Sequence, residues 1–214
     1  MRELKYYLYV SESKLAMLYD QMPEKTRSKL AAELKIDLKV ISATVKKGEG
    51  QQNQFSRLRL LTEYINESRE VGSIQFPGKY FAGCLHMRWG IWGEDWSRPE
   101  ERIVYFTGQA AGTIVGLGGS PHHLIGPSRN EPVLDSMGGK SNLLRILSAL
   151  SNDPELSIEL KRYRGLEAES AASAVMASVE KLPGPAQSLE FLAKSLMTSS
   201  GVVLGTPLYV ALAE

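Results

Sequence analysis

Two adjacent histidines, His122 and His123, follow a glycine-rich stretch in the sequence GLGGSPHHLIG, residues 116–126. Imidazoles can act as acids, bases, metal ligands or hydrogen-bond donors. Glycines let a backbone bend and approach a ligand closely, where a side chain would clash. The combination predicts a ligand-binding loop at the end of a strand.

A second group of polar and aromatic residues precedes this loop. His86 and Arg88 alternate along a predicted strand, so their side chains share one face and could together bind an anion. Three tryptophans follow closely, and Trp92 is expected to line a pocket. We expect the loop and this strand to share one pocket for a small anionic ligand. The predicted ligand-binding residues are His86, Arg88, Trp92, Gly118, Gly119, Ser120 and His122.

Two short glycine patterns fail the tests for nucleotide-binding loops. MGGKSN, residues 137–142, ends like a P-loop, but Leu134 stands where the first glycine is required. GLGGSP misses the dinucleotide-binding pattern because Pro121 takes the third glycine position. The predicted anion site is therefore a looser one, with backbone amides of the glycine loop as donors.

Catalytic and metal sites find less support in the sequence. Ser120 and His122 lie too close along the chain for a normal nucleophile and base. Cys84, on a predicted strand, is expected to be a small buried residue. Neighbouring residues of an extended chain point to opposite sides, so His122 and His123 should not converge on one ion. We expect no metal site and no cofactor.

The composition is that of a globular protein without a strong electrostatic field. The chain has 214 residues, a formal net charge of +1, and 43% hydrophobic residues. The small charge argues against extended nucleic acid as a partner. No apolar run approaches the roughly 20 residues that span a membrane, and a single cysteine suits a reducing compartment. We expect a cytoplasmic protein that binds a small anion, with a homodimer or a protein partner as an open alternative.

Hydrophobic periodicity predicts the elements that position these residues. Alternation and helical spacing are both present along the chain, and Phe81, Leu85, Met87, Trp89 and Ile91 share one face of a central strand. The predicted strands are 4–11, 35–47, 79–92, 102–108, 112–119 and 201–214. The predicted helices are 11–22, 24–34, 55–72, 141–153, 167–182 and 186–197, and residues 48–54 are expected to form a loop.

This order of elements predicts an α+β fold in a single domain, residues 1–214. A mixed, largely antiparallel sheet of about six or seven strands would be flanked by helices. The helical segment 141–198 could form a lobe, and the strand at 201–214 is expected to return to the sheet. A doubly wound parallel sheet is the alternative, although three closely spaced central strands argue against it.

Four blocks of the sequence together resemble a bacterial family of unknown function that is common in actinomycetes. They are LKYYLYVSESKLAMLY, PGKYFAGCLHMRWG, VYFTG and TIVGLGGSPHHLIG, which fall within roughly residues 4–126. The resemblance brings no activity, ligand or catalytic residue with it. Families of this kind often accompany signalling or anti-phage genes.

Two functions are consistent with these observations. The first is a ligand-binding or interaction protein in a bacterial signalling or defence pathway, which senses a nucleotide-like anion. The alternative is a small hydrolase or phosphodiesterase that uses His86, His122 or His123. The first is preferred because the sequence offers no complete set of acid, base and nucleophile.

Overall fold

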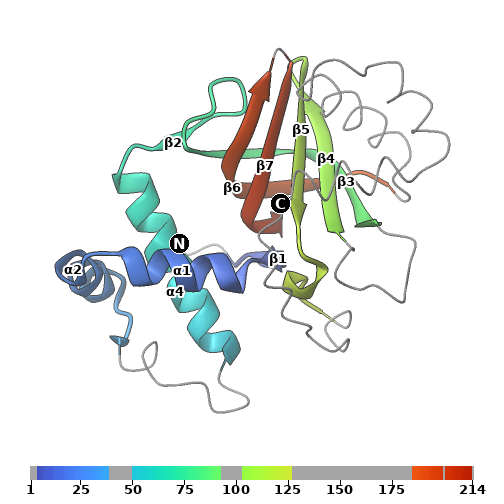
Figure 1. Cartoon of the computed structure of the whole chain (residues 1–214). Coiled ribbons are helices and arrows are strands. Elements are labelled where there is room, and N and C mark those ends of the chain that lie inside the picture. The colour runs from blue at the N-terminus through green and yellow to red at the C-terminus, as the bar shows by residue number, and fades with distance from the viewer. Residues whose placement is uncertain (1–3, 39–49, 93–102, 127–184, 200, 214) are drawn as a thin grey trace. The chain divides into compact units, whose positions relative to one another are not determined.

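The computed structural model describes residues 4–38, 50–92, 103–126, 185–199 and 201–213. The contacts within the chain divide it into two compact units. Residues 1–10 and 72–214 form the first, which we call the barrel unit, and residues 11–71 form the second, the helical unit (Figure 1).

Seven strands of the described chain form one sheet, and five of them close into a barrel. Around the barrel the order is β3, β4, β5, β7 and β6, and β6 completes the ring by pairing with both β3 and β7. All neighbours are antiparallel except β5 and β7, which run parallel. The strands are β1 (Tyr6–Val10), β2 (Val71–Gly72), β3 (Tyr80–Trp92), β4 (Ile103–Ala110), β5 (Thr113–Gly119), β6 (Gln187–Ser199) and β7 (Val202–Leu212).

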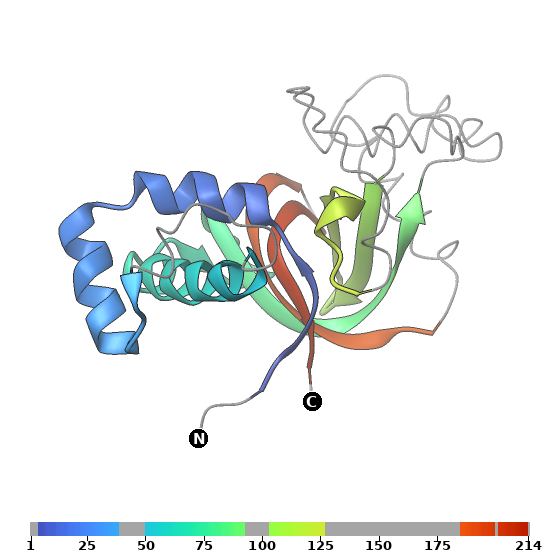
Figure 2. The ribbon, with the colours of Figure 1, turned by 90° about the horizontal axis from the view of Figure 1, so that it is seen from below.

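The predicted α+β class and the largely antiparallel sheet are confirmed, but the sheet closes into a barrel instead of remaining flat. Closure depends on the length of β3, which changes partner along its course. Residues 80–87 of β3 pair with β6, and residues 87–92 pair with β4. Met87 belongs to both ladders, because it pairs with Gln187 on one side and Gly108 on the other. The strong curvature of these strands is visible in Figure 2.

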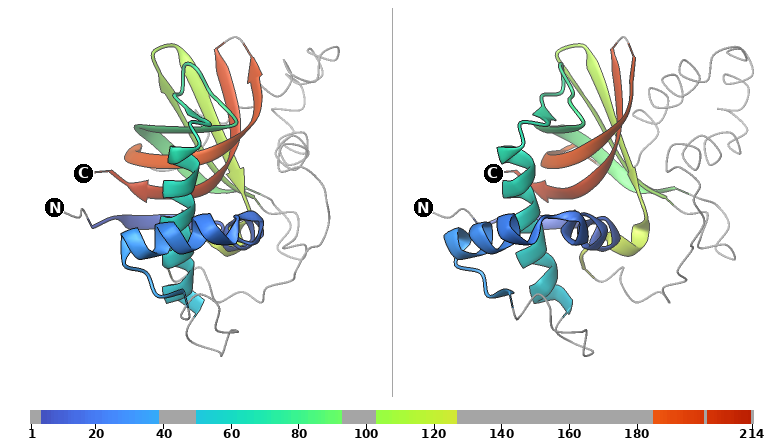
Figure 3. Two further views of the ribbon diagram at one scale, coloured as in Figure 1. Left: turned by 90° about the vertical axis from the view of Figure 1, so that its left-hand side faces the viewer. Right: turned by 60° about the vertical axis from the view of Figure 1, so that its left-hand side comes forward.

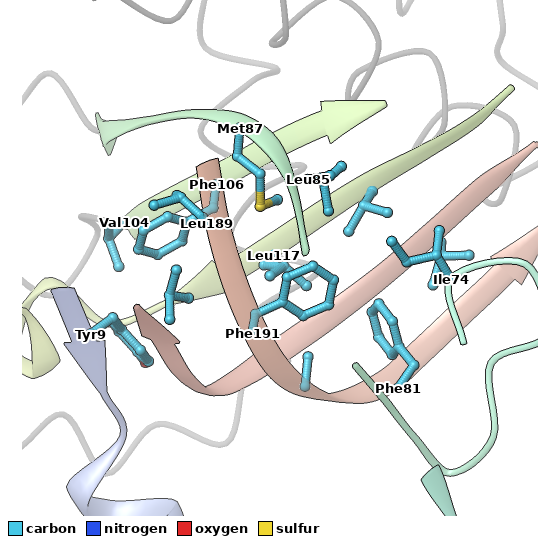
Figure 4. Packing of buried hydrophobic residues seen from close by; sticks show 14 of the residues in the cluster. Tyr9, Ile74, Phe81, Leu85, Met87, Val104, Phe106, Leu117, Leu189 and Phe191 are labelled. Carbon is cyan, nitrogen blue, oxygen red and sulfur yellow. The ribbon is translucent and has the colours of Figure 1, made fainter. Parts of the chain in front are cut away.

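Apolar side chains fill the interior of the barrel (Figure 4). The rings of Phe81 and Phe191 meet edge to face with their centroids 5.5 Å apart, a favoured aromatic geometry. Trp89 is half-buried and stacks on Phe106 at 5.8 Å. The cluster comprises Tyr9, Ile74, Phe81, Leu85, Met87, Val104, Phe106, Val115, Leu117, Leu124, Leu189, Phe191, Ala193, Val203 and Val210.

The β3 register predicted from the sequence is confirmed. Phe81, Leu85 and Met87 are buried in the core, and His86 lies on the opposite face. The exception is Ile91, near the end of the strand, which is 48% exposed.

The turn between β4 and β5 lies slightly later than the sequence predicts. Ala110 pairs with Thr113, so Ala111 and Gly112 form a two-residue loop. Both have positive φ, 47° and 79°, as a type I′ hairpin turn requires. β4 therefore extends two residues beyond Gly108, where the predicted strand ends.

The helix predicted at 186–197 is wrong, because these residues form most of β6. Leucine, alanine, glutamate and lysine give the segment a high helix propensity. Its apolar residues also alternate, however, and Leu189, Phe191 and Ala193 all enter the barrel core. Tertiary packing against β3 and β7 therefore overrides the local preference. This also corrects the C-terminal part of the predicted helical segment 141–198.

Three further predictions differ from the structure or lie outside it. Of the strand predicted at 35–47, residues 35–38 are described and do not form a strand. The loop predicted at 48–54 is wrong from Gly50 onward, where α4 begins. The helices predicted at 141–153 and 167–182 lie outside the described residues.

The helical unit contains α1 (Glu12–Gln21), α2 (Glu24–Leu34) and α4 (Gly50–Glu67). Helix α4 packs against both α1 and α2, and it crosses α1 steeply in Figure 3. The buried ring of Tyr19 connects the three helices, because the guanidinium groups of Arg27 and Arg57 lie 4.8 and 5.4 Å from its centroid. No described helix is long and apolar enough to cross a membrane.

The register of β3 predicts how two substitutions on this strand should differ. Leu85→Ala should lower the free energy of unfolding by about 2–5 kcal/mol, because it leaves a cavity in the barrel core. Ile91→Ala, on the same strand but with an exposed side chain, should cost much less. Urea denaturation of both variants measures the difference, and equal losses would contradict the register.

Candidate functional site

The filled interior leaves the outer surface of the barrel as the place for a site. A barrel of eight strands is only just wide enough for side chains to fill it. The five strands here enclose a narrower space, which aromatic and aliphatic residues occupy. Within the described part of the barrel, the places left for a ligand are therefore the outward-facing side chains and the ends of the strands.

Three side chains that could bind a ligand or react, at every second position of β3, lie on the outer face of this strand. Cys84 and His86 are exposed, and Arg88 is half-buried. The prediction that Cys84 is buried is wrong, because core packing uses the other face of the strand. His86 and Arg88 are two residues apart on one face, so their Cα atoms lie about 6.7 Å apart. Both side chains can therefore approach the same small group.

Ser188 of β6 fixes one edge of the His86 imidazole. The two residues pair directly across the β3–β6 ladder, and the Ser188 Oγ atom lies 2.8 Å from His86 Nδ1. On the inner face of β3, Trp89 Nε1 donates a hydrogen bond of 3.1 Å to Oε1 of Gln187, which lies on β6 beside Ser188. Two neighbouring residues of β6 therefore contact β3 side chains close to Arg88, one on the outer face and one on the inner face.

Thr107 of β4 lies directly opposite Arg88 across the β3–β4 ladder. It is fully buried, and its Oγ1 has no hydrogen-bond partner among the described residues. Its other cross-strand neighbour is Gly116 of β5, which has no side chain. A buried hydroxyl without a partner costs about 1–3 kcal/mol, so such a group requires an explanation.

A carboxylate lies beside this face, but other groups offset its charge. Glu190 is the next outward residue after Ser188 on β6, and it forms an ion pair of 2.5 Å with Lys5. Tyr209 also hydrogen-bonds to Glu190, and the pKa of its phenol is raised, first by burial and second by the negative charge of Glu190. The ion pair with Lys5 reduces the repulsion that Glu190 would exert on a nearby anion.

The glycine-rich loop has a structural role that the sequence did not reveal. Gly119 faces inward, and the space that a side chain would need is occupied by Tyr9, because an added Cβ would lie 2.3 Å from Tyr9 Oη. The chain then forms the short 3-10 helix η2 (Pro121–His123) and reaches β1, where Ile125 N donates to Leu8 O at 2.9 Å. The loop therefore ties the end of β5 to β1.

The two histidines that follow the glycines occupy different environments. The ring of His123 meets the buried Tyr9 ring edge to face at 5.8 Å. His122 is half-buried. The expectation that the two side chains point to opposite sides assumed an extended chain, whereas both histidines lie in the 3-10 helix η2. Among the described residues no group of three or more histidine, cysteine or acidic side chains could hold a metal ion.

The predicted site residues are thus only partly together. Gly118 is aligned with Tyr105 of β4, which is aligned with Gly90 of β3. Two strand spacings put Gly118 about 10 Å from Gly90. His86 and Arg88 share the outer face of β3, whereas Gly119 faces inward. Ser120 and His122 lie at the start of η2, and the side chain of Trp92 lies outside the described residues.

Sequence reasoning missed two residues of this face. The contact of Ser188 with His86 was missed because the segment that contains Ser188 was predicted as a helix. A helix at this position gives no pairing that would place Ser188 beside His86. Thr107 follows Phe106 in a strand that the sequence does predict, so alternation alone puts it outside the core. Its alignment with Arg88 depends on the register of β3 against β4, which alternation within each strand does not specify.

Comparison with known proteins adds a family but no activity. A model of a family of unknown function, DUF7019, matches residues 5–214, and the chain belongs to that family. No curated protein and no solved structure matches the chain. The family membership confirms the resemblance to a family of unknown function.

The close approach of Gly119 and Tyr9 predicts that substitutions at the two positions are coupled. Gly119→Ala should destabilise the protein by about 1–3 kcal/mol, because its Cβ overlaps the Tyr9 hydroxyl and ring. Tyr9→Phe removes the closest atom and should recover part of that loss in the double variant. Thermal denaturation of the four proteins tests this coupling. Strictly additive effects would show that Tyr9 does not fill the space beside Gly119.

Proposed function

We propose that this protein binds a small anionic ligand on the outer face of β3, with Arg88 and His86 as its main donors. The guanidinium of Arg88 supplies a permanent positive charge and a planar set of N–H groups suited to oxyanions. His86 supplies a second donor two residues away on the same face. A half-buried arginine forms stronger charge-assisted bonds than a fully solvated one, because water competes less.

The hydrogen bond between Ser188 and His86 is the observation that carries the proposal. When the Ser188 hydroxyl donates to Nδ1, a neutral imidazole carries its proton on Nε2. The Nε2–H group is then a donor on the opposite edge of the ring, away from Ser188. In that tautomer the ring donates to a ligand, beside a residue that is always cationic. Two neighbouring donors select an anion over a neutral or cationic molecule.

The glycine loop has a smaller part in this proposal than the sequence suggests. Its inward glycine, Gly119, serves the packing of Tyr9, whereas Gly116 and Gly118 lie on the outward side of β5, and Gly116 is aligned with Thr107. On the resemblance alone, we propose that the protein acts in a bacterial signalling or defence pathway, where binding of the ligand is the signal that it senses.

Titration of the purified protein with adenosine monophosphate tests the proposal by calorimetry. This probe carries the nucleotide-like anion that the site is expected to take. Arg88→Gln should weaken binding roughly tenfold or more, because it removes a charge-assisted interaction. Arg59→Gln, at an exposed position on α4, is the matched control and should bind like the wild type. Equal affinities of wild type and Arg88→Gln would refute the proposal.

A second candidate function rests on the same hydrogen bond. With His86 Nδ1 as general base, Ser188 Oγ could act as a nucleophile, as in small hydrolases. Nucleophilic pairs of this kind normally have an acid that orients the other ring nitrogen. Glu190 is the nearest acid along β6, but it is engaged by Lys5 and Tyr209. The binding function is therefore the better supported of the two.

Turnover of p-nitrophenyl acetate and bis-p-nitrophenyl phosphate separates the candidates. For a binding protein we expect no hydrolysis above the rate of the Ser188→Ala variant. Hydrolysis that Ser188→Ala abolishes, and that Ser195→Ala on the same strand retains, would establish the hydrolase instead.

A further inference from the structure

We propose that the hydroxyl of Thr107 is a third donor to the ligand, and that the ligand is therefore a phosphate or a phosphate monoester. This inference rests on the proposed function, because it concerns the same site. It starts from the one fully buried side-chain oxygen beside Arg88 that has no hydrogen-bond partner among the described residues.

The position of Thr107 relative to Arg88 supports a shared ligand. Residues directly opposite each other in an antiparallel pair have Cβ atoms about 5 Å apart. The hydroxyl and the base of the arginine side chain are therefore neighbours. On the other side, Gly116 contributes no side chain that could accept the hydroxyl proton. An oxygen held by Arg88 is the acceptor that this arrangement can supply.

The number of donors selects the chemical class of the ligand. Arg88, His86 and Thr107 come from two adjacent strands and offer three separate donor groups. A carboxylate has two oxygens, whereas a terminal phosphate group has three strong acceptor oxygens and carries up to two negative charges. A phosphate group can therefore offer a separate oxygen to each of the three donors, whereas a carboxylate must share one of its two oxygens between two donors.

The burial of Thr107 also predicts that water is excluded from the hydrogen bond between its hydroxyl and the ligand. Thr107 has no solvent exposure, so a ligand oxygen reaches it only when the side chains around it shift, and that oxygen is then withdrawn from water. Hydrogen bonds and charge pairs are stronger in such surroundings than at an open surface. Without a ligand the hydroxyl is left unsatisfied, and the unliganded protein is less stable for it. Affinity and stability should therefore respond in opposite directions when the hydroxyl is removed.

Thr107→Val tests this directly, because valine has nearly the same shape and lacks the hydroxyl. Inorganic phosphate, adenosine monophosphate and acetate are the probes, titrated by calorimetry into the full chain. Thr107→Val should weaken the binding of both phosphate probes about tenfold, and Thr107→Ser should restore most of the affinity. The melting temperature of unliganded Thr107→Val should equal or exceed that of the wild type. Acetate should bind more weakly than phosphate to the wild type.

Thr206→Val is the matched control, since Thr206 is another buried threonine of the barrel, on β7. It should leave phosphate affinity unchanged. A lower melting temperature of unliganded Thr107→Val would show that the hydroxyl has a structural partner, and would overturn the inference. So would wild-type phosphate affinity in Thr107→Val.

The same titrations separate this inference from the proposed function. If Arg88→Gln loses phosphate binding and Thr107→Val does not, the anion site stands and Thr107 is not part of it. If both variants bind phosphate like the wild type, the proposed site and this inference both fail. Binding of phosphate and of adenosine monophosphate with equal affinity would identify the phosphate group itself as the recognised part. Tighter binding of the nucleotide would show additional contacts outside it.

Discussion

The double pairing of β6 is the constraint on which the barrel unit depends. β6 pairs with β3 along one edge and with β7 along the other, and without it the remaining strands would form an open sheet. Closure brings Phe81 of β3 and Phe191 of β6 into one core. The narrow interior that results has room for side chains and none for a ligand. The polar side chains of the described strands that could act on a ligand are thereby placed outside the barrel or at its ends.

The change of partner at Met87 determines which outward residues become neighbours. Before Met87, β3 pairs with β6, and His86 is directly opposite Ser188. After Met87, β3 pairs with β4, and Arg88 is directly opposite Thr107. Side chains from three strands therefore gather within a few residues of β3. The same curvature that closes the core thus concentrates donors on the outer surface. Glu190 would oppose an anion here, and its ion pair with Lys5 offsets that charge.

Much of this architecture could be predicted from the sequence, and the failures have definite causes. Strict alternation specified β3 and its buried face, because Phe81, Leu85 and Met87 leave no other register. The β6 segment was mistaken for a helix, since Leu, Ala, Glu and Lys favour helix locally and only the rest of the barrel makes the strand preferable. Without β6 neither the closure nor the Ser188–His86 contact could be foreseen. Gly119 was expected to serve a ligand, but the inserted Tyr9 ring, distant in sequence, is what requires it.

The protonation of the His86 ring tests the central claim most directly. The claim is that Ser188 donates to Nδ1 and leaves an Nε2–H group for an anion. Nitrogen NMR of protein with labelled histidine, with the signal assigned by comparison with a His86→Gln sample, reports which ring nitrogen carries the proton. The account predicts an Nε2–H ring near neutral pH and a shift of the Nε2 signal when phosphate is added. A ring protonated on Nδ1 alone, or an Nε2 signal that phosphate leaves unchanged, would contradict it.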